Sequence, residues 1–125
     1  MVNVDEVLGE LRGRLGIEYL GSQDSDLVGA DPSRLSEFCD IYEKGGLDDR
    51  QRTALMALIV ASLDSFLSEG LSDTVLEERV SDLVKRNFTL HRDTVEYWSK
   101  LREPHEGENL WSVTPLMRSI WREKV

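Results

Sequence analysis

The sequence has one cysteine, two histidines and no long apolar run, and each shortage excludes a class of protein. A single cysteine cannot form an intramolecular disulfide, which suits a reducing cytoplasm. Cys39 lies in an apolar-periodic stretch, so we expect a buried, unreactive thiol. The longest apolar run, residues 54–61, is too short to cross a membrane. The acidic N-terminus lacks the basic start and apolar core of a signal peptide, so we expect a cytoplasmic protein.

Basic residues are also scarce relative to acidic ones. The 125 residues hold 15 Lys and Arg against 24 Asp and Glu, a formal net charge of -9. A nucleic-acid binder normally carries a basic patch, and an anionic membrane surface would repel this chain. We therefore expect no nucleic-acid partner and no membrane partner. A basic protein, in contrast, would be attracted.

The apolar residues recur at helical spacing along most of the chain, and alternation with a period of two is nowhere sustained. A length of 125 residues is typical of one domain. We predict an all-α fold, a compact single-domain bundle of five to six helices spanning residues 1–125. The middle of the third helix is apolar almost all round, which predicts that residues 54–67 form the centre of the bundle.

Capping signals give the expected ends of the helices. Asn3 and the Asp31-Pro32 pair are predicted to start the first two helices, separated by a loop over residues 17–30. Asp48 with Gln51 predicts a capping box for the third helix, which we expect to end at Gly70. Leu71 is then expected to pack back on Phe66.

Three further helices are expected after Gly70. Ser72 is predicted to cap the fourth helix, a fifth spans residues 89–101, and Thr114 before Pro115 is predicted to cap the last. A polar loop containing Pro104 separates the last two. The expected inward-facing residues are Val75, Leu76, Val80, Leu83, Val84, Leu90, Val95, Trp98, Leu101, Leu116 and Ile120, with Met117 and Trp121 as further candidates.

Residue types that carry chemistry do not converge in the sequence. His91 is two residues from Asp93, so the two do not share a helix face, and we interpret His91 as a helix-face histidine. His105 lies near Glu106 and Glu108, where a weak surface metal site competes with a simple solvated loop, the reading we favour. No phosphate-binding loop or nucleophile motif is present. We predict no catalytic residue, no metal and no cofactor.

Acidic residues on exposed helix positions are the first feature that packing does not explain. Asp73 and Glu77 are four residues apart, as are Glu78 and Asp82, and like charges at this spacing repel. They serve either solubility or the binding of a basic partner. The candidate partner-binding residues are Asp73, Glu77, Glu78, Asp82, Asp48 and Asp49.

Tryptophan is the second such feature. Trp98, Trp111 and Trp121 all lie in the last 28 residues, within the segment 88–125 in which acidic and basic side chains balance. Each fits either core packing or an interface anchor, and the helix positions do not separate the two.

Two segments resemble a known family. The stretch GGLDDRQRTALMALIVASLDSF, residues 45–66, and the tail ENLWSVTPLMRSIW, residues 108–121, are similar to small all-helical bacterial immunity proteins. These protect against the toxins of contact-dependent growth-inhibition and other polymorphic toxin systems. The resemblance implies a cytoplasmic inhibitor that binds one toxin domain and blocks its active site. It carries over no functional residue, because such proteins share no binding motif.

Two functions therefore lead. The first is an immunity-type inhibitor of a cognate basic toxin domain, such as a nuclease, because acidic surfaces complement cationic ones. The second is a non-catalytic helical adaptor or subunit of a larger or homo-oligomeric assembly, held together through tryptophan and leucine faces. Either a monomer or a homodimer is compatible with the sequence. A catalyst or metal-dependent protein is a third, weaker hypothesis.

Overall fold

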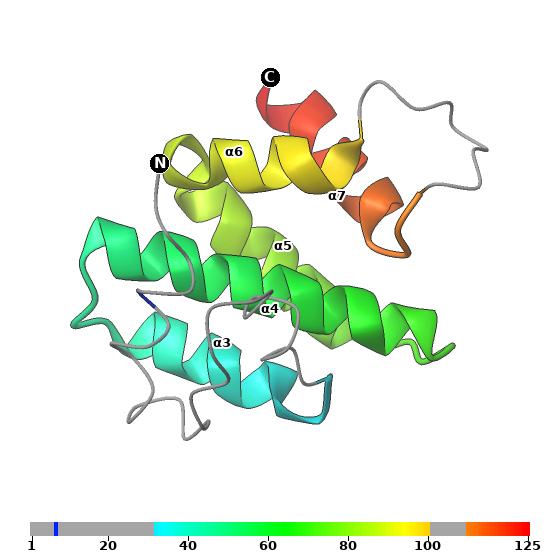
Figure 1. The fold of residues 1–125 in the computed structure, drawn as a ribbon, viewed down its shortest axis with the longest axis horizontal. Coiled ribbons are helices and arrows are strands. Elements are labelled where there is room, and N and C mark those ends of the chain that lie inside the picture. Colours follow the sequence, from blue (N-terminus) through cyan, green and yellow to red (C-terminus); the bar gives the residue numbers. More distant parts are fainter. Residues whose placement is uncertain (1–6, 8–31, 101–109) are drawn as a thin grey trace.

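Helices make up most of the described part of the chain, which is Val7 together with residues 32–100 and 110–125 of a computed structural model (Figure 1). No strand occurs in these residues, and the predicted all-α fold is confirmed. The predicted helix over residues 3–16, the loop over 17–30 and the polar loop around Pro104 fall on residues that are not described, apart from the buried Val7. The elements in chain order are η1 (Pro32–Arg34), α3 (Leu35–Lys44), α4 (Asp49–Ser68), α5 (Thr74–Arg86), α6 (Phe88–Ser99) and α7 (Thr114–Lys124).

Helix α4 is the apolar centre, as predicted. It packs against η1, α3, α5 and α6, and its buried residues therefore lie all round the helix rather than on one stripe. The buried positions run without a break from Leu58 to Leu63. Helix α3 adds the predicted stripe of Leu35, Phe38, Cys39 and Tyr42, all buried.

The predicted signals at both ends of α4 are confirmed. The Asp48 carboxylate accepts from the Gln51 backbone N–H at 2.7 Å, and the Gln51 side chain accepts from the Asp48 N–H at 3.1 Å. Gly70 has a φ of 80°, and its N–H donates to the Leu67 carbonyl while the Leu71 N–H donates to the Phe66 carbonyl. These two bonds are the Schellman arrangement that a left-handed glycine permits. Leu71 itself stays 48% exposed.

Helix α5 departs from the prediction in two places. Its cap is Asp73 rather than Ser72, because the Asp73 carboxylate accepts from the Leu76 backbone N–H at 3.1 Å. Val75, predicted to face inward, is 78% exposed. It stands five positions before Val80, so the two do not share a helix face. The predicted Val80, Leu83 and Val84 are buried.

Helices α6 and α7 pack closely on each other and are joined by polar contacts. The prediction that the Thr114 side chain caps α7 is wrong, because Thr114 is the first residue of that helix. Its hydroxyl donates to the Trp98 carbonyl and accepts from the Trp111 N–H. Arg118 is buried, and its guanidinium donates to the carbonyls of Ser99 and Lys100 at 2.7 Å each. A cation at these carbonyls stabilises the C-terminal end of α6.

The predicted inward faces of α6 and α7 are largely confirmed. Val95, Trp98, Met117 and Ile120 are buried, whereas Leu90 and Leu116 are half-buried and Leu101 is not among the described residues. Helix α5 contacts each of α3, α4, α6 and α7, so it joins the α3–α4 pair to the α6–α7 pair (Figure 1). Among the described helices, none has both the length and the apolarity needed to cross a membrane.

Candidate functional site: an acidic groove between α5 and α7

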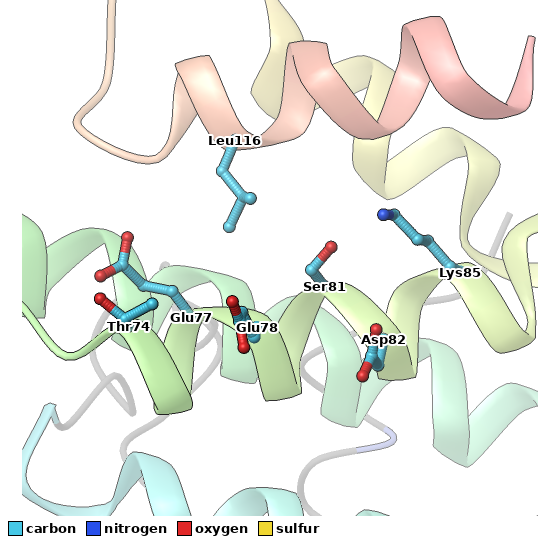
Figure 2. A pocket seen from close by; sticks show the side chains of 7 residues that line it. All are labelled: Thr74, Glu77, Glu78, Ser81, Asp82, Lys85 and Leu116. Atoms are coloured by element: carbon cyan, nitrogen blue, oxygen red, sulfur yellow. The ribbon is translucent and has the colours of Figure 1, made fainter.

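A groove of about 450 Å³ runs along α5 beneath α7 (Figure 2). Three of its residues, Glu77, Glu78 and Asp82, are carboxylates that the sequence analysis singled out. Thr74 and Lys85 mark its ends along α5, a span of about 16 Å at the rise of an α-helix. The full lining is Thr74, Glu77, Glu78, Ser81, Asp82, Lys85 and Leu116.

The spacing along α5 explains why these side chains gather. Glu77, Ser81 and Lys85 are four residues apart and form one row, while Glu78 and Asp82 form the neighbouring row. The opposite side of α5 carries Val80, Leu83 and Val84, which are buried in the core. Because that side is buried, the two polar rows face outward. Leu116 of α7 lies above them and forms the apolar wall of the groove (Figure 2).

The charges in the groove are only partly neutralised. The Lys85 ammonium lies 2.6 Å from the Glu123 carboxylate of α7, so it is already paired. Glu77 accepts a bond from the Asp73 backbone N–H at 3.3 Å. Within the described residues, Glu78 and Asp82 form neither an ion pair nor a hydrogen bond. The groove therefore presents an excess of negative charge toward whatever enters it.

Ser81 lies at the floor of the groove and is a residue that the sequence analysis missed. It is only 8% exposed, and its hydroxyl points up from α5 toward α7, on the side of Leu116 that faces Lys85 (Figure 2). Its side chain forms no hydrogen bond with the rest of the described chain. The row that it shares with Glu77 and Lys85 was the available signal, but serine between charged residues is ordinary on a solvated helix face.

The other predicted acidic residues lie elsewhere. Asp73 caps α5, and Asp48 caps α4. Asp49 lies in the first turn of α4, 3.5 Å from the Arg52 guanidinium. Asp48 and Asp73 flank opposite ends of the 20-residue α4, which is about 30 Å long. The six predicted residues therefore do not form one surface, and three of them line the groove.

The opposite flank of α5 has a filled acidic cluster. The Arg79 guanidinium lies 2.6 Å from Asp40 and 2.9 Å from Glu43, both on α3. Its other terminal nitrogen lies 3.5 Å from the Ser36 hydroxyl and 3.4 Å from the Ser36 carbonyl. The bonds to Glu43 and Asp40 raise the pKa of Arg79 further above its ordinary value.

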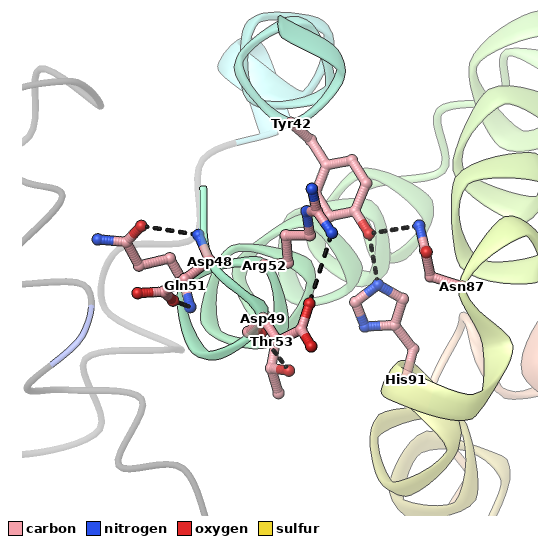
Figure 3. Close-up of polar contacts among 8 residues, drawn as sticks. All are labelled: Tyr42, Asp48, Asp49, Gln51, Arg52, Thr53, Asn87 and His91. Atoms are coloured by element: carbon pink, nitrogen blue, oxygen red, sulfur yellow. Dashed lines mark hydrogen bonds and ion pairs between the residues drawn. The ribbon is translucent and has the colours of Figure 1, made fainter. Parts of the chain in front are cut away.

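Of the two histidines, only His91 lies among the described residues. His91 is fully buried in α6, and its Nε2 lies 2.6 Å from the Tyr42 hydroxyl, which also accepts from Asn87 at 3.3 Å (Figure 3). Burial, aided by the nearby Arg52 charge, lowers the pKa of His91 to about 4, so the ring is neutral at pH 7. His91 was predicted to lie on a helix face, and that face of α6 proves to be buried. His105, Glu106 and Glu108 lie outside the described residues.

Cys39 lies among the described residues, and the arrangement of possible metal ligands is known for those residues alone. Cys39 is fully buried in α3, and this burial raises the pKa of its thiol to about 11, which agrees with the expected unreactive thiol. In the same residues, no three His, Cys, Asp or Glu side chains converge as metal ligands.

The three tryptophans occupy two different environments. Trp98 is buried, and its ring centre lies 4.5 Å from that of Trp111, which is half-buried. Tyr97, 59% exposed, extends this aromatic cluster with its ring centre 5.1 Å from that of Trp111. Trp121 is half-buried and lies edge-on to Phe88. Trp98 is thus a core residue, while Tyr97 brings the cluster to the surface.

Comparisons with known proteins supply no relative. No protein-family model, curated protein or solved structure matches this chain.

Proposed function

We propose that this protein is an immunity-type inhibitor, acting in the cytoplasm, that binds a cognate basic toxin domain through the groove between α5 and α7. The observation that supports this proposal is the gathering of Glu77, Glu78 and Asp82 in one groove beside an apolar wall. A cationic surface, such as the phosphate-binding face of a nuclease, is electrostatically complementary to such a groove. The resemblance of residues 45–66 and 108–121 to immunity proteins points in the same direction.

Charged contacts and apolar contacts both stabilise the proposed complex. The carboxylates speed association with a basic partner and select against acidic ones. Leu116 adds apolar area that slows dissociation. No side chain of this protein has to react with the toxin, because occupation of the toxin's active site is enough to block it.

The test is capture of the partner from the native organism with three baits, followed by a growth assay. The baits are the wild-type protein, a groove variant with Glu77→Gln, Glu78→Gln and Asp82→Asn, and a control variant with Asp93→Asn and Glu96→Gln on the exposed surface of α6. We expect one basic protein with the wild type and the control, and at least a tenfold loss with the groove variant. Expression of that protein alone should arrest bacterial growth, and co-expression of the wild type should restore it.

Several outcomes would contradict the proposal. A captured protein that is not toxic, or a toxin whose effect the wild-type chain does not relieve, removes the inhibitor function. Equal protection by the groove variant and the wild type at physiological salt removes the groove as the contact surface.

The exposed aromatic cluster favours a second candidate, a non-catalytic adaptor or homo-oligomeric subunit. Tyr97 and Trp111 are the kind of large side chains that anchor interfaces, and Lys100 lies 4.3 Å above the Trp111 ring. Light scattering over a range of concentrations tests it directly. A dimer that Tyr97→Ser dissociates would support this candidate, and a monomer at all concentrations would contradict the homo-oligomeric form.

A further inference from the structure

The floor of the groove holds a polar group without a partner. Ser81 is 8% exposed, its hydroxyl points into the groove, and it forms no hydrogen bond in the described part of the chain (Figure 2). The residue is mostly buried, but its hydroxyl still reaches the groove and can donate to or accept from a ligand that enters it. The carboxylates of Glu78 and Asp82 flank it within one helical turn and are likewise unpaired among the described residues.

The molecule contains a filled version of the same set of groups. On α3, one serine and two carboxylates, those of Ser36, Asp40 and Glu43, surround the guanidinium of Arg79. On α5, one serine and two carboxylates again occur within two helical turns, but the one cation in the described lining, Lys85, pairs with Glu123 instead of with them. The α3 cluster is completed by an arginine from the neighbouring helix, whereas α7 contributes only Leu116 to the lining of the groove.

We propose that the groove binds one arginine side chain of the basic partner, with its guanidinium donating to Ser81, Glu78 and Asp82 and its methylene stem lying on Leu116. This inference rests on the proposed function and names the side chain that the groove recognises. The apolar wall suits the stem, because arginine buries its methylene groups while keeping its charged head on acceptors.

Arginine fits this set of acceptors better than lysine does. The guanidinium is planar and has five N–H donors in a fixed arrangement, so it can bond a hydroxyl and two carboxylates together. The contacts of Arg79 with Ser36, Asp40 and Glu43 show that geometry within this protein. The ammonium of Lys85, in contrast, pairs with the single carboxylate of Glu123.

The experiment is a titration of the protein with three pentapeptides whose ends are blocked, monitored by two-dimensional amide NMR at low ionic strength. Each peptide has glycine at every position but the central one, which is arginine, its uncharged analogue citrulline, or lysine. We expect the arginine peptide to shift the amides of residues 77–85 and of Leu116 most strongly. The lysine peptide should bind more weakly, and the citrulline peptide should leave these amides unchanged, since it has no charge.

Three variants assign the contacts. Glu78→Gln and Asp82→Asn should each raise the Kd of the arginine peptide by about fivefold, and Ser81→Ala by about threefold. Glu96→Gln, which removes an equal charge from the exposed surface of α6, should leave the Kd unchanged. The amide spectra of the free variants show whether each one keeps the fold.

Each result separates this inference from the function on which it rests. Equal binding of the citrulline peptide, tighter binding of the lysine peptide, or Kd values unchanged by the three variants would overturn the arginine site. If the arginine peptide does not bind but the groove variant loses the toxin, the groove binds its partner by another chemistry. If the peptide binds and the groove variant still protects fully, the arginine site stands and the proposed contact surface is wrong.

Discussion

Helix α5 borders an acidic cluster on each of two sides, and the two clusters differ in where the cation comes from. Toward α3, the carboxylates of Asp40 and Glu43 face Arg79, which α5 itself supplies. Toward α7, α5 supplies the carboxylates of Glu78 and Asp82, and the Lys85 ammonium in the same groove pairs with Glu123 rather than with them. The first cluster is complete within the molecule, and the second has room for a cation from outside.

This difference teaches that a count of acidic residues does not identify a binding surface. Asp40, Glu43, Glu78 and Asp82 all lie on helix surfaces and read alike in the sequence. What separates them is the neighbouring helix, which brings an arginine to one pair and a leucine to the other. The same charge therefore stabilises the fold in one place and is free for recognition in the other.

The largest expected effect is the loss of stability on protonation of His91 at acid pH. This loss has to be measured separately from the effect of the carboxylates before acid unfolding can compare the two clusters. The pKa of His91 is about 4 in the folded protein, against an ordinary value of 6.5 for histidine. Because the folded state disfavours the proton, stability is full above pH 6.5 and is lost as the pH falls toward 4. The expected loss is about 3 kcal/mol, measured as the free energy of unfolding in urea across this range.

The control for this effect is His91→Phe, which keeps a ring in the core and removes the titrating group. We expect its stability to change much less between pH 6.5 and pH 4, although Tyr42 loses one hydrogen-bond partner and keeps Asn87. The charged groups that act on His91, Arg52 and Asp49, stay in place in the variant. An unchanged slope would mean that carboxylates cause the loss, and that acid unfolding reports on the clusters instead.

The second prediction compares the stability lost when Arg79, which pairs with α3, or Lys85, which pairs with α7, is replaced. Arg79→Met should lower the free energy of unfolding by about 1.5 kcal/mol, because Asp40 and Glu43 lose their charge-assisted bonds to it and Glu43 keeps only the longer 4.0 Å contact with Arg86. Lys85→Met, the matched change beside the groove, should cost about 0.5 kcal/mol or less, since it breaks one exposed pair. Equal losses in urea unfolding would show that the α3 cluster is no more structural than the groove.

The third effect tests acidic residues that act on the backbone. Asp48→Ala should cost about 1 kcal/mol, because the Gln51 N–H loses its acceptor at the start of α4. Asp49→Ala, one residue later, should cost about 0.5 kcal/mol or less, since it loses only the exposed 3.5 Å contact with Arg52 and a favourable helix-dipole interaction. Thermal unfolding of both variants checks the order. A larger loss for Asp49→Ala would contradict the capping role.

The parts of the fold that sequence patterns predicted are those set by neighbouring residues. The Asp48–Gln51 capping box and the Gly70 turn depend on residues three to five positions apart, and both are present. The errors arise where local signals compete. Ser72 and Asp73 are both good caps, and Asp73 is used. Thr114 bonds Trp98, a residue 16 positions away, instead of capping its own helix.

The candidate site was predictable only in part. The i, i+4 spacing of Glu78 and Asp82 indicated their shared face, and the structure places them in one groove. Three further facts depend on packing between helices: the pairing of Lys85 with Glu123, the capture of Asp40 and Glu43 by Arg79, and the burial of Ser81. Contacts between residues about 40 positions apart leave no periodic trace in one sequence.

The smallest expected effect on stability has the opposite sign and tests the comparison most directly. Neutralising the groove with Glu78→Gln and Asp82→Asn removes a like-charge pair four residues apart on α5, so the free energy of unfolding should rise by about 0.3 kcal/mol. Urea unfolding at low salt measures it, and the gain should shrink at high salt as screening increases. A loss of 1 kcal/mol or more would mean that these carboxylates hold the fold together, as the α3 cluster does. Increased stability of the variant, together with weaker binding of a basic partner, would show that the molecule forgoes a little stability to leave this charge unpaired.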